Sequence, residues 1–227
     1  MLYFLLYDDN SHNIFLENLI TSIHKYSTQY KIILYHKNDI DPEFVEKCNH
    51  ILSLKRGGGY WLWKPYIINK LLTKINNDDV IFYLDSKYYF TEKFECLYLE
   101  HMKNNDLLIW KNKPNESNNY MKNWCKMDVI LKYDMFNKIF IDNAEDCWAG
   151  SIVIKKTDFA VKLMNEWFDM CCIYENITDS PSIAINSVLF NEHRHDQSLL
   201  SIIVHKYNIK MLYFEKKYLQ NVRCPYY

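Results

Sequence analysis

Glycine is scarce in this chain, and most of it lies in one place. The 227 residues include four glycines, and three of them are the consecutive Gly57, Gly58 and Gly59. Glycine permits backbone conformations and close approaches that other residues disfavour. We therefore interpret the stretch at residues 55–90, which contains this run near its start, as a segment where the chain passes close to a ligand.

An excess of charge of either sign is also absent. The chain has 27 Lys and Arg against 28 Asp and Glu, a formal net charge of −1. Proteins that bind nucleic acid or an acidic membrane through their overall field carry a marked basic excess. We therefore expect no nucleic-acid partner, and any recognition of anions must be local.

Long apolar segments and paired cysteines are missing as well. The apolar start at residues 1–7 is too short to span a membrane and lacks the features of a signal peptide. The seven cysteines are odd in number and form no Cys-x-x-Cys pair, which is typical of reduced thiols. We expect a cytoplasmic protein without a transmembrane segment.

Several catalytic motifs do not occur. Lys64 is followed by Pro65 instead of Ser or Thr, so the glycine run does not form a phosphate-binding P-loop. There is no Gly-x-Ser-x-Gly motif, and no cysteine lies in a recognisable nucleophile motif. The sequence therefore gives no support for a hydrolase.

Short apolar runs alternate with segments of helical spacing along the first 90 residues. Strands are predicted at residues 2–7, 31–35, 51–54, 80–84, 107–110 and 211–214, and a further buried strand directly follows the small-residue pair Ala149-Gly150 within residues 147–154. Helices are predicted between the early strands, and a late helix carries the apolar residues 199–203. This alternation favours an α/β fold with a parallel sheet flanked by helices, and we expect residues 1–227 to form a single domain.

Polar and aromatic side chains gather around the helix that we predict to begin at Pro65. Tyr60 and Lys64 precede it at a loop-to-helix junction, a type of position that attracts anions. Asp85 directly follows the predicted strand at residues 80–84. Because ligands bind at the carboxyl ends of strands in open α/β sheets, we expect these side chains to share a site.

Three short motifs then follow one another along the chain: Tyr83-Leu84-Asp85-Ser86-Lys87, Trp148-Ala149-Gly150-Ser151 and Asp196-Gln197-Ser198. Their order resembles GT-A type glycosyltransferases of the glycogenin and bacterial galactosyltransferase group. The Gly-Tyr-Trp-x-Trp-Lys-Pro run at residues 59–65, Lys-x-Asp at 126–128 and His-x-His-Asp-Gln at 193–197 resemble a bacterial and viral branch. The resemblance covers roughly residues 1–210 and implies a mixed, mainly parallel sheet with helices on both faces.

The resemblance also implies a function. A glycosyltransferase of this type moves a sugar from a nucleoside-diphosphate sugar, with UDP-sugars favoured, to a hydroxyl group of a glycan or other acceptor, as in polysaccharide synthesis. The alternative is a catalytically inactive module of the same fold that binds sugar nucleotides or serves as a scaffold.

The resemblance further implies roles for individual residues. The catalytic candidates are Asp85, His195, Asp196 and Gln197. The candidates for binding the donor nucleotide and diphosphate are Asp8, Arg56, Gly59, Tyr60, Trp63, Lys64 and Lys87. The candidates for contacts with the acceptor or the sugar are Lys126, Asp128, Trp148, Gly150 and His193.

The chain departs from the family pattern at Lys87, where a second carboxylate usually binds the divalent cation. Lys87, assisted by Lys64 and Arg56, is one candidate to replace the metal, because fixed cations also stabilise a departing diphosphate. The other possibility is that Asp85 holds Mn or Mg together with His193 or His195. The sequence leaves both possibilities open.

Plainer explanations remain for several of these residues. Asp196 is well placed to cap the helix that follows it, and turn formation accounts for Asp8. Lys126 and Asp128 form a simple surface pair if the resemblance is misleading. The aromatic side chains near the glycine run, including Tyr60, have flat faces that could stack on a base or a sugar ring, and at least one of them is expected to belong to the core.

Overall fold

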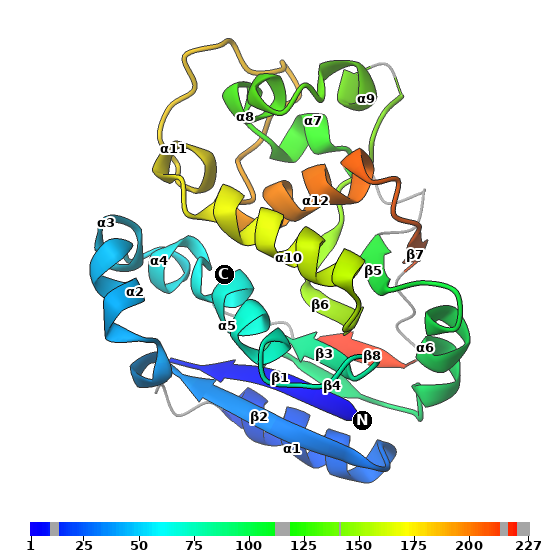
Figure 1. Ribbon diagram of the computed structural model, residues 1–227. Helices are drawn as coiled ribbons and strands as arrows, with labels where there is room; N and C mark the ends of the chain where they lie inside the picture. Colours follow the sequence, from blue (N-terminus) through cyan, green and yellow to red (C-terminus); the bar gives the residue numbers. More distant parts are fainter. Residues whose placement is uncertain (10–13, 112–118, 141, 214–217, 222–227) are drawn as a thin grey trace.

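A six-stranded sheet forms the centre of the molecule, in a computed structural model that describes residues 1–9, 14–111, 119–140, 142–213 and 218–221 (Figure 1). The strand order is β2-β1-β3-β6-β5-β7. Strand β1 runs parallel to β2 and β3, β6 runs antiparallel to β3 and β5, and β5 runs parallel to β7. The strands are β1 (Leu2–Asp8), β2 (Tyr30–His36), β3 (Val80–Leu84), β5 (Leu107–Lys111), β6 (Trp148–Lys155) and β7 (Met211–Tyr213). The predicted mixed, mainly parallel sheet is therefore confirmed.

Side chains of the strands enter two apolar cores, one on each face of the sheet. In β1, Leu5 belongs to one core, whereas Phe4 and Leu6 belong to the other. Successive side chains of a strand point to opposite faces, and a strand buried on both faces is therefore apolar almost throughout. This explains why β1 and β3 are continuous apolar runs instead of alternating patterns.

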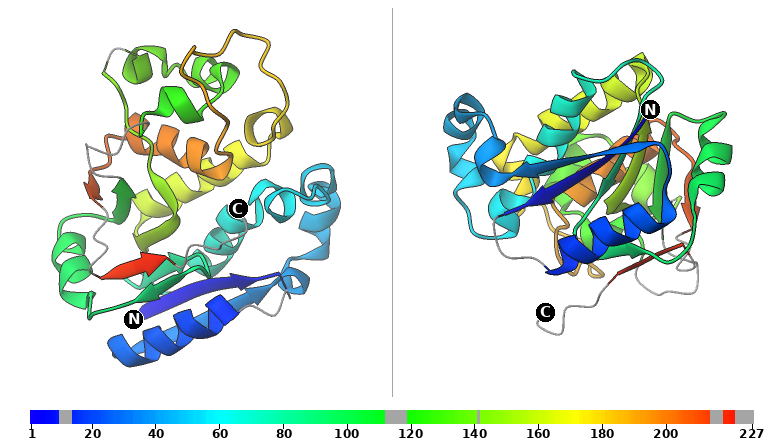
Figure 2. Two further views of the ribbon diagram at one scale, coloured as in Figure 1. Left: turned by 180° about the vertical axis from the view of Figure 1, so that it is seen from behind. Right: turned by 90° about the horizontal axis from the view of Figure 1, so that it is seen from below.

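Helices cover both faces of the sheet, as predicted. Helix α1 (Ile14–Tyr26) lies on one face, and α5 (Trp63–Leu72), α10 (Asp158–Cys171) and α12 (Asp196–Lys206) lie on the other (Figure 2). Thr157 caps α10 by accepting a hydrogen bond from the N–H of Ala160 at 3.1 Å. The remaining helices are α2 (Pro42–Lys47), α3 (Asn49–Leu52), α4 (Gly57–Tyr60), α6 (Glu95–Met102), α7 (Met121–Trp124), α8 (Met127–Lys132), α9 (Phe136–Phe140) and α11 (Tyr174–Ile177), with a short 3-10 helix at Lys37–Asp39.

Two details of the predicted secondary structure are wrong. Residues 51–54 form no strand, because the chain at Asn49–Leu52 forms the helical turn α3, in which the N–H of Leu52 bonds to the carbonyl of Cys48 at 2.9 Å. The predicted helix begins at Trp63, two residues before Pro65. Pro65 still lies in the first turn, where a helix leaves N–H groups without an intrahelical partner.

A second, small sheet joins two distant parts of the chain. Strand β4 (Tyr88–Phe90) pairs antiparallel with β8 (Leu219–Asn221). Because β4 begins three residues after Asp85, this pairing fixes the chain that leaves the carboxyl end of β3. Among the described residues, no helix is long and apolar enough to cross a membrane.

Candidate functional site

A cavity of about 380 Å³ opens at the carboxyl end of β3. The chain segments that bound it include the start of α5, the residues after β3, the start of β6 and the start of α12. The lining residues are Arg56, Trp61, Lys64, Asp85, Lys87, Tyr88, Asn119, Trp124, Asp146, Trp148, Ala149, Gly150, Glu192, Arg194, His195, Asp196 and Gln197. The ordered motifs of the sequence therefore meet in one place.

Asp85 is held at the floor of this cavity by the sheet. Its backbone N–H donates to the carbonyl of Gly150 at 2.9 Å, and its Oδ1 accepts a hydrogen bond from the Tyr83 hydroxyl at 2.6 Å. A Cβ atom on Gly150 would lie 2.7 Å from Asp85 Oδ2 and 3.0 Å from the Tyr88 hydroxyl oxygen. The missing side chain of Gly150 thus leaves the space that Asp85 and Tyr88 occupy.

Lys64 is a buried cation shared between two carboxylates. Its Nζ lies 2.7 Å from Asp196 Oδ2 and 3.7 Å from Asp85 Oδ1, and the whole residue is 3% exposed. Lys87 approaches the other oxygen of Asp85 at 3.5 Å and is half exposed. Both oxygens of Asp85 therefore face an ammonium group, one deep in the protein and one near the surface.

This arrangement separates the protonation behaviour of the two carboxyl groups. Burial alone raises the pKa of Asp85, but Lys64, Lys87 and the Tyr83 hydroxyl lower that pKa below its usual value. Burial raises the pKa of Asp196, and the single ammonium of Lys64 offsets only part of that effect. The pKa of Lys64 is raised, because its two carboxylate partners outweigh the burial that lowers it. Asp85 and Lys64 are thus charged together.

Asp196 does not cap helix α12, which was the plainer explanation for it. The cap position belongs to His195, and Asp196 is the first helical residue, with its carboxylate turned to Lys64. His195 has φ 55° and ψ −121°, and the N–H of Gln197 donates to the carbonyl of Arg194 at 3.0 Å. This is the geometry of a type II′ turn with histidine at the position that favours glycine. Such strain is found where the surroundings fix a residue, often at functional sites.

The three consecutive glycines make a left-handed turn. All five residues 57–61 have positive φ, between 53° and 95°, and the N–H of Trp61 bonds to the carbonyl of Gly57 at 3.2 Å. A Cβ atom on Gly59 would lie 2.6 Å from the Cα of Leu52 in α3. The prediction for this run was a close approach to a ligand; the approach that the structure shows is to α3, and Gly59 itself does not line the cavity.

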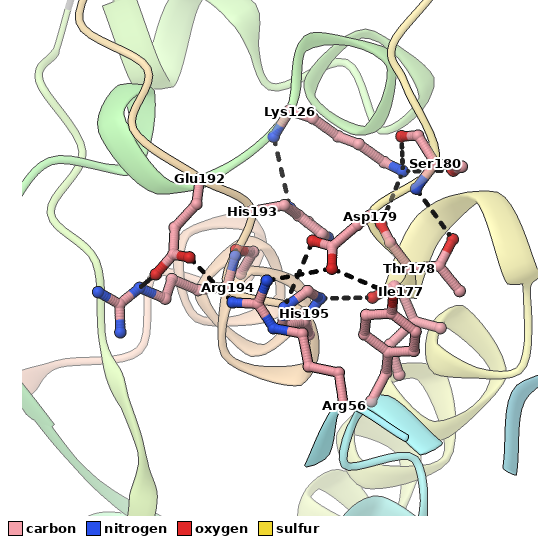
Figure 3. Close-up of polar contacts among 12 residues, drawn as sticks. Arg56, Lys126, Ile177, Thr178, Asp179, Ser180, Glu192, His193, Arg194 and His195 are labelled. Carbon is pink, nitrogen blue, oxygen red and sulfur yellow. Dashed lines mark hydrogen bonds and ion pairs between the residues drawn. The ribbon is translucent and has the colours of Figure 1, made fainter. Parts of the chain in front are cut away.

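Arg56 connects this turn to the chain that precedes α12 (Figure 3), and Tyr60 does so as well. Arg56 Nη1 and the Tyr60 hydroxyl both donate to Asp179 Oδ2 at 3.1 Å, and Arg56 Nη2 donates to Glu192 at 2.9 Å. These side chains of Arg56, Asp179 and Glu192 are each about two-fifths exposed. Arg56 thus lies at the rim of the cavity with its charge already balanced, whereas Tyr60 lies outside the lining.

His193 and His195 are both turned toward main-chain carbonyls. His193 Nε2 donates to Asn176 at 2.7 Å and its Nδ1 accepts from the N–H of Lys126 at 3.4 Å, which defines one neutral tautomer. His195 Nδ1 donates to Ile177 at 2.7 Å. Burial lowers the pKa of His193 to about 3 and that of His195 to about 4. Both are neutral near pH 7, and only His195 lines the cavity.

Lys126 and Asp128 hold the chain at residues 178–184 and do not line the cavity. Lys126 Nζ donates to the carbonyls of Thr178 and Ser180, each at 3.1 Å, and Lys126 is 3% exposed. Asp128 accepts hydrogen bonds from the N–H groups of residues 183 and 184, each at 2.8 Å. Lys126 and Asp128 therefore do not form a surface pair with each other, and neither of them lines the cavity.

Two further donor-site candidates lie away from the cavity. Trp63 stacks on Tyr7 with ring centroids 3.7 Å apart and donates from Nε1 to the carbonyl of Gly57 at 3.0 Å. Asp8 ends β1 opposite His36, with Oδ2 3.7 Å from His36 Nδ1. Asp8 Oδ1 is buried and accepts no hydrogen bond from the described residues. Asp8 Oδ1 is therefore a buried acceptor at the carboxyl end of β1.

Several lining residues carry no motif and were not predicted. Asp146 and Glu192 are the two additional carboxylates, Tyr88 is the additional hydroxyl group, and Arg194 adds a guanidinium that stacks over Trp124 at 4.2 Å. Arg194 neighbours the predicted His193 and His195, so its position in the chain is the one signal that pointed to it. Asp146 precedes a predicted strand and had no such signal.

The donor set does not fit a resident divalent cation. Among the described residues, no three His, Cys, Asp or Glu side chains are placed to hold a metal. His193 and His195 each use one ring nitrogen for a main-chain carbonyl, and each Asp85 oxygen faces an ammonium group.

Comparisons with known proteins place the fold. Neither a protein-family model nor a curated protein sequence matches the chain. Solved structures do match over 95% of the chain: mouse xyloside xylosyltransferase 1 in its apo form (TM-score 0.51, 8% identity, 84% of that chain), the bifunctional glycosyltransferase WbbM in its apo form (TM-score 0.54, 11% identity, 39% of that chain), and the galactosyltransferase LgtC in complex with donor and acceptor sugar analogs (TM-score 0.50, 16% identity, 74% of that chain). The GT-A glycosyltransferase-like fold predicted from the motifs is confirmed.

Proposed function

We propose that this protein is a glycosyltransferase that moves a sugar from a nucleoside-diphosphate sugar to a hydroxyl group of a glycan acceptor. The observation that carries the proposal is the buried Asp85–Lys64–Asp196 network at the floor of the cavity, at the carboxyl end of β3. Ligands of open α/β sheets bind at that edge. The fold shared with solved glycosyltransferases supports the same conclusion.

In this proposal, lysine and arginine side chains take the place of a metal at the diphosphate. Transfer breaks the bond between the anomeric carbon and a phosphate oxygen, and negative charge develops on the departing diphosphate. Lys87 is half exposed at the cavity, and Arg194 also lines it. Fixed cations aimed at developing charge lower the barrier without a metal. Lys64, held between two carboxylates, keeps Asp85 charged and in place.

The sugar and the acceptor occupy the part of the cavity beside α12. Gln197 and Asp196 lie at the start of this helix, and Trp148 and Trp124 also line the cavity. Flat aromatic faces and hydrogen-bonding side chains suit a pyranose ring. Because the resemblance favours UDP as the nucleotide, UDP-sugars are the first donors to test.

The test is turnover of a panel of sugar nucleotides, measured with and without excess chelator, after binding has been detected by thermal shift. A ligand at one hundred times its Kd stabilises the protein by about 2.7 kcal/mol. We expect a UDP-sugar to bind and to be hydrolysed slowly or transferred, with a rate that the chelator leaves unchanged. Lys87→Ala should lower kcat by about 10²-fold to 10³-fold, whereas Lys103→Ala, on an exposed lysine far from the cavity lining, should not.

Three other results have distinct meanings. Complete loss of turnover with chelator would contradict the metal-free proposal but leave the transferase in place. Binding of a sugar nucleotide without turnover would favour the non-catalytic binding module. Absence of binding across the panel would contradict a nucleotide-sugar site altogether.

A further inference from the structure

Asp146 is a buried carboxyl group on the wall of the cavity. It is 7% exposed, and its backbone N–H donates to the carbonyl of Asn119 at 2.6 Å. It lies two residues before β6 and faces the first two turns of α12. The roles proposed above for the cavity do not involve Asp146.

The two oxygens of Asp146 each have one neutral donor. Gln197 Nε2 donates to Oδ2 at 2.5 Å, and Ser201 Oγ donates to Oδ1 at 2.8 Å. Gln197 and Ser201 lie one helical turn apart in α12, so their side chains emerge on the same face. The carboxylate therefore spans two side chains of one rigid helix.

The charge of Asp146 determines which end of the Gln197 amide faces the cavity. An ionised carboxylate only accepts hydrogen bonds, whereas a glutamine amide has a donor end and an acceptor end. Gln197 must therefore turn its NH₂ group to Asp146, and its oxygen points the other way. No hydrogen bond from a described residue reaches that oxygen, and Gln197 lines the cavity.

Asp146 differs in its partners from the other two carboxylates of the cavity. Asp85 and Asp196 each have an ammonium group within 4 Å, whereas no cation of the described residues lies that close to Asp146. The charged and titratable groups that face it are Arg194 and Asp196, on α12 and the chain before it, and the thiols of Cys125 and Cys147. Burial raises its pKa to about 6, so protonation in mild acid removes the charge that orients Gln197.

We propose that Asp146 is a positioning residue that holds the side-chain amide of Gln197 with its oxygen toward the bound sugar. The oxygen then meets a group that donates a hydrogen bond or carries positive charge, such as a sugar hydroxyl or the anomeric carbon as the diphosphate departs. This inference rests on the proposed function for its chemistry. The orientation itself depends only on contacts within the chain.

The orientation is tested without any activity by nuclear magnetic resonance. The side-chain ¹H–¹⁵N signals of Gln197, assigned by their loss in Gln197→Ala, should shift with pH around a midpoint near 6. In Asp146→Asn that titration should vanish. In Ser201→Ala, which removes a hydrogen bond that lowers the pKa of Asp146, the midpoint should move to higher pH.

The catalytic consequence is tested by the pH profile of kcat with a sugar nucleotide that the protein turns over. For the unmodified protein we expect kcat to fall as pH falls through about 6. Asp146→Asn should lower kcat by about 10²-fold, the size expected for a misplaced group, abolish that limb and leave donor affinity within threefold. Ser201→Ala should move the limb to higher pH, a result that a merely structural role would not produce.

Each arm has an outcome that overturns the proposal. A Gln197 signal that ignores pH, or that titrates equally in Asp146→Asn, shows that Asp146 does not orient the amide. A kcat within twofold in Asp146→Asn, with the titration abolished, shows that the orientation has no role in transfer. Failure to find any turnover counts against the proposed function alone, because the resonance measurement still decides the orientation.

Discussion

Gly150 shows what one absent side chain does for the cavity. Gly150 lies in β6, close to Asp85 and Tyr88. A methyl group at this position would lie 2.7 Å from Asp85 Oδ2 and 3.0 Å from the Tyr88 hydroxyl oxygen. For Gly150→Ala we expect a loss of about 1–3 kcal/mol in the free energy of unfolding, the range for overpacked positions. Donor binding should also weaken, because Asp85 must move. Denaturation and calorimetric titration measure the two effects.

Gly58→Ala is the matched control for this substitution. A Cβ atom there meets nothing closer than 3.7 Å, at Trp63 Nε1, although φ is 58°. The expected cost is the conformational one alone, about 1–2 kcal/mol, without an effect on donor affinity. Equal loss of donor binding in both variants would show that Gly150 acts through stability and not through Asp85.

Removal of Lys64 tests the buried network. Lys64→Met keeps much of the apolar stem but leaves Asp196 and Asp85 without their shared partner, and loss of one member of a buried pair costs about 3–5 kcal/mol. The double variant Lys64→Met with Asp196→Asn should recover part of this loss, because it removes the uncompensated charge. Urea denaturation at pH 7 provides the comparison.

The exposed Lys103 provides the matched control for the Lys64→Met experiment. Lys103 pairs with Glu100 at 2.6 Å, and both side chains are more than half exposed. Exposed pairs contribute about 0–1 kcal/mol, so Lys103→Met should change stability little. A similar small effect for Lys64→Met would mean that the buried ion pair is not a source of stability.

Among elements, the segment at residues 178–184 depends most on a few side chains. Asp128 binds two of its N–H groups and Lys126 binds two of its carbonyls. For Asp128→Ala we expect faster hydrogen exchange and faster proteolysis in this segment, with weaker donor binding as a second effect, because Asp179 in the same segment holds Arg56 at the rim. Hydrogen-exchange mass spectrometry compares the segment with α10 as an internal reference.

Two results would contradict this account of the loop. Unchanged exchange in the segment would show that Asp128 is not what orders it. Lys122→Ala serves as the control on α7, because the Lys122 ammonium donates to Asn143 at 2.8 Å and lies outside the segment. An equal change in that variant would indicate a general loss of stability.

The elements that the sequence predicted best are those with long apolar runs. Strand β3 was predicted with its observed bounds, since residues 80–84 are all apolar and are buried or nearly so. The strand predicted at residues 51–54 is wrong, because a short run of three apolar residues and one serine suits a helical turn equally well. Strand β8 pairs with β4, and 128 residues of chain separate Phe90 from its partner Leu219. A local sequence pattern does not predict a pairing between segments so far apart.

The residues of the candidate site likewise include some that the sequence predicted and some that it did not. Residues within a motif, such as Lys64, Asp85 and Asp196, were predicted and lie at the cavity, although their roles remain predictions. Asp146 was missed because its importance comes from Ser201 and Gln197, which only the packing of α12 brings to it. Conversely, the sequence predicts Gly59 and Lys126 as ligand contacts, and among the described residues Gly59 packs against α3 and Lys126 binds the carbonyl of Thr178.

At the scale of the whole molecule, the stability of the fold depends on pH through Asp146. Its pKa is about 6 in the folded chain against an ordinary value of 3.8, so between these values the folded state binds more protons than the unfolded state. The contribution of Asp146 to the free energy of unfolding is therefore largest below about pH 4 and is lost as the pH rises through 6. The difference corresponds to about 3 kcal/mol.

Asp146→Asn should remove this dependence. Relative to the unmodified protein, the variant should gain stability on going from pH 4.5 to pH 8, because it has no charge to bury at the higher pH. Urea denaturation at a series of pH values measures the difference between the two proteins. A difference that stays constant over the series would show that Asp146 has an ordinary pKa in the folded protein.

The left-handed turn at residues 57–61 has a consequence for inheritance. Glycine is the one genetically encoded amino acid without a chiral Cα, and each of Gly57, Gly58 and Gly59 has a positive φ. Every missense change in these three codons therefore places a handed residue in a turn of the opposite hand, at a conformational cost of about 1–2 kcal/mol, to which Gly57 and Gly59 add a steric clash. In a gene that accumulates substitutions elsewhere, we therefore expect these three codons to keep encoding glycine.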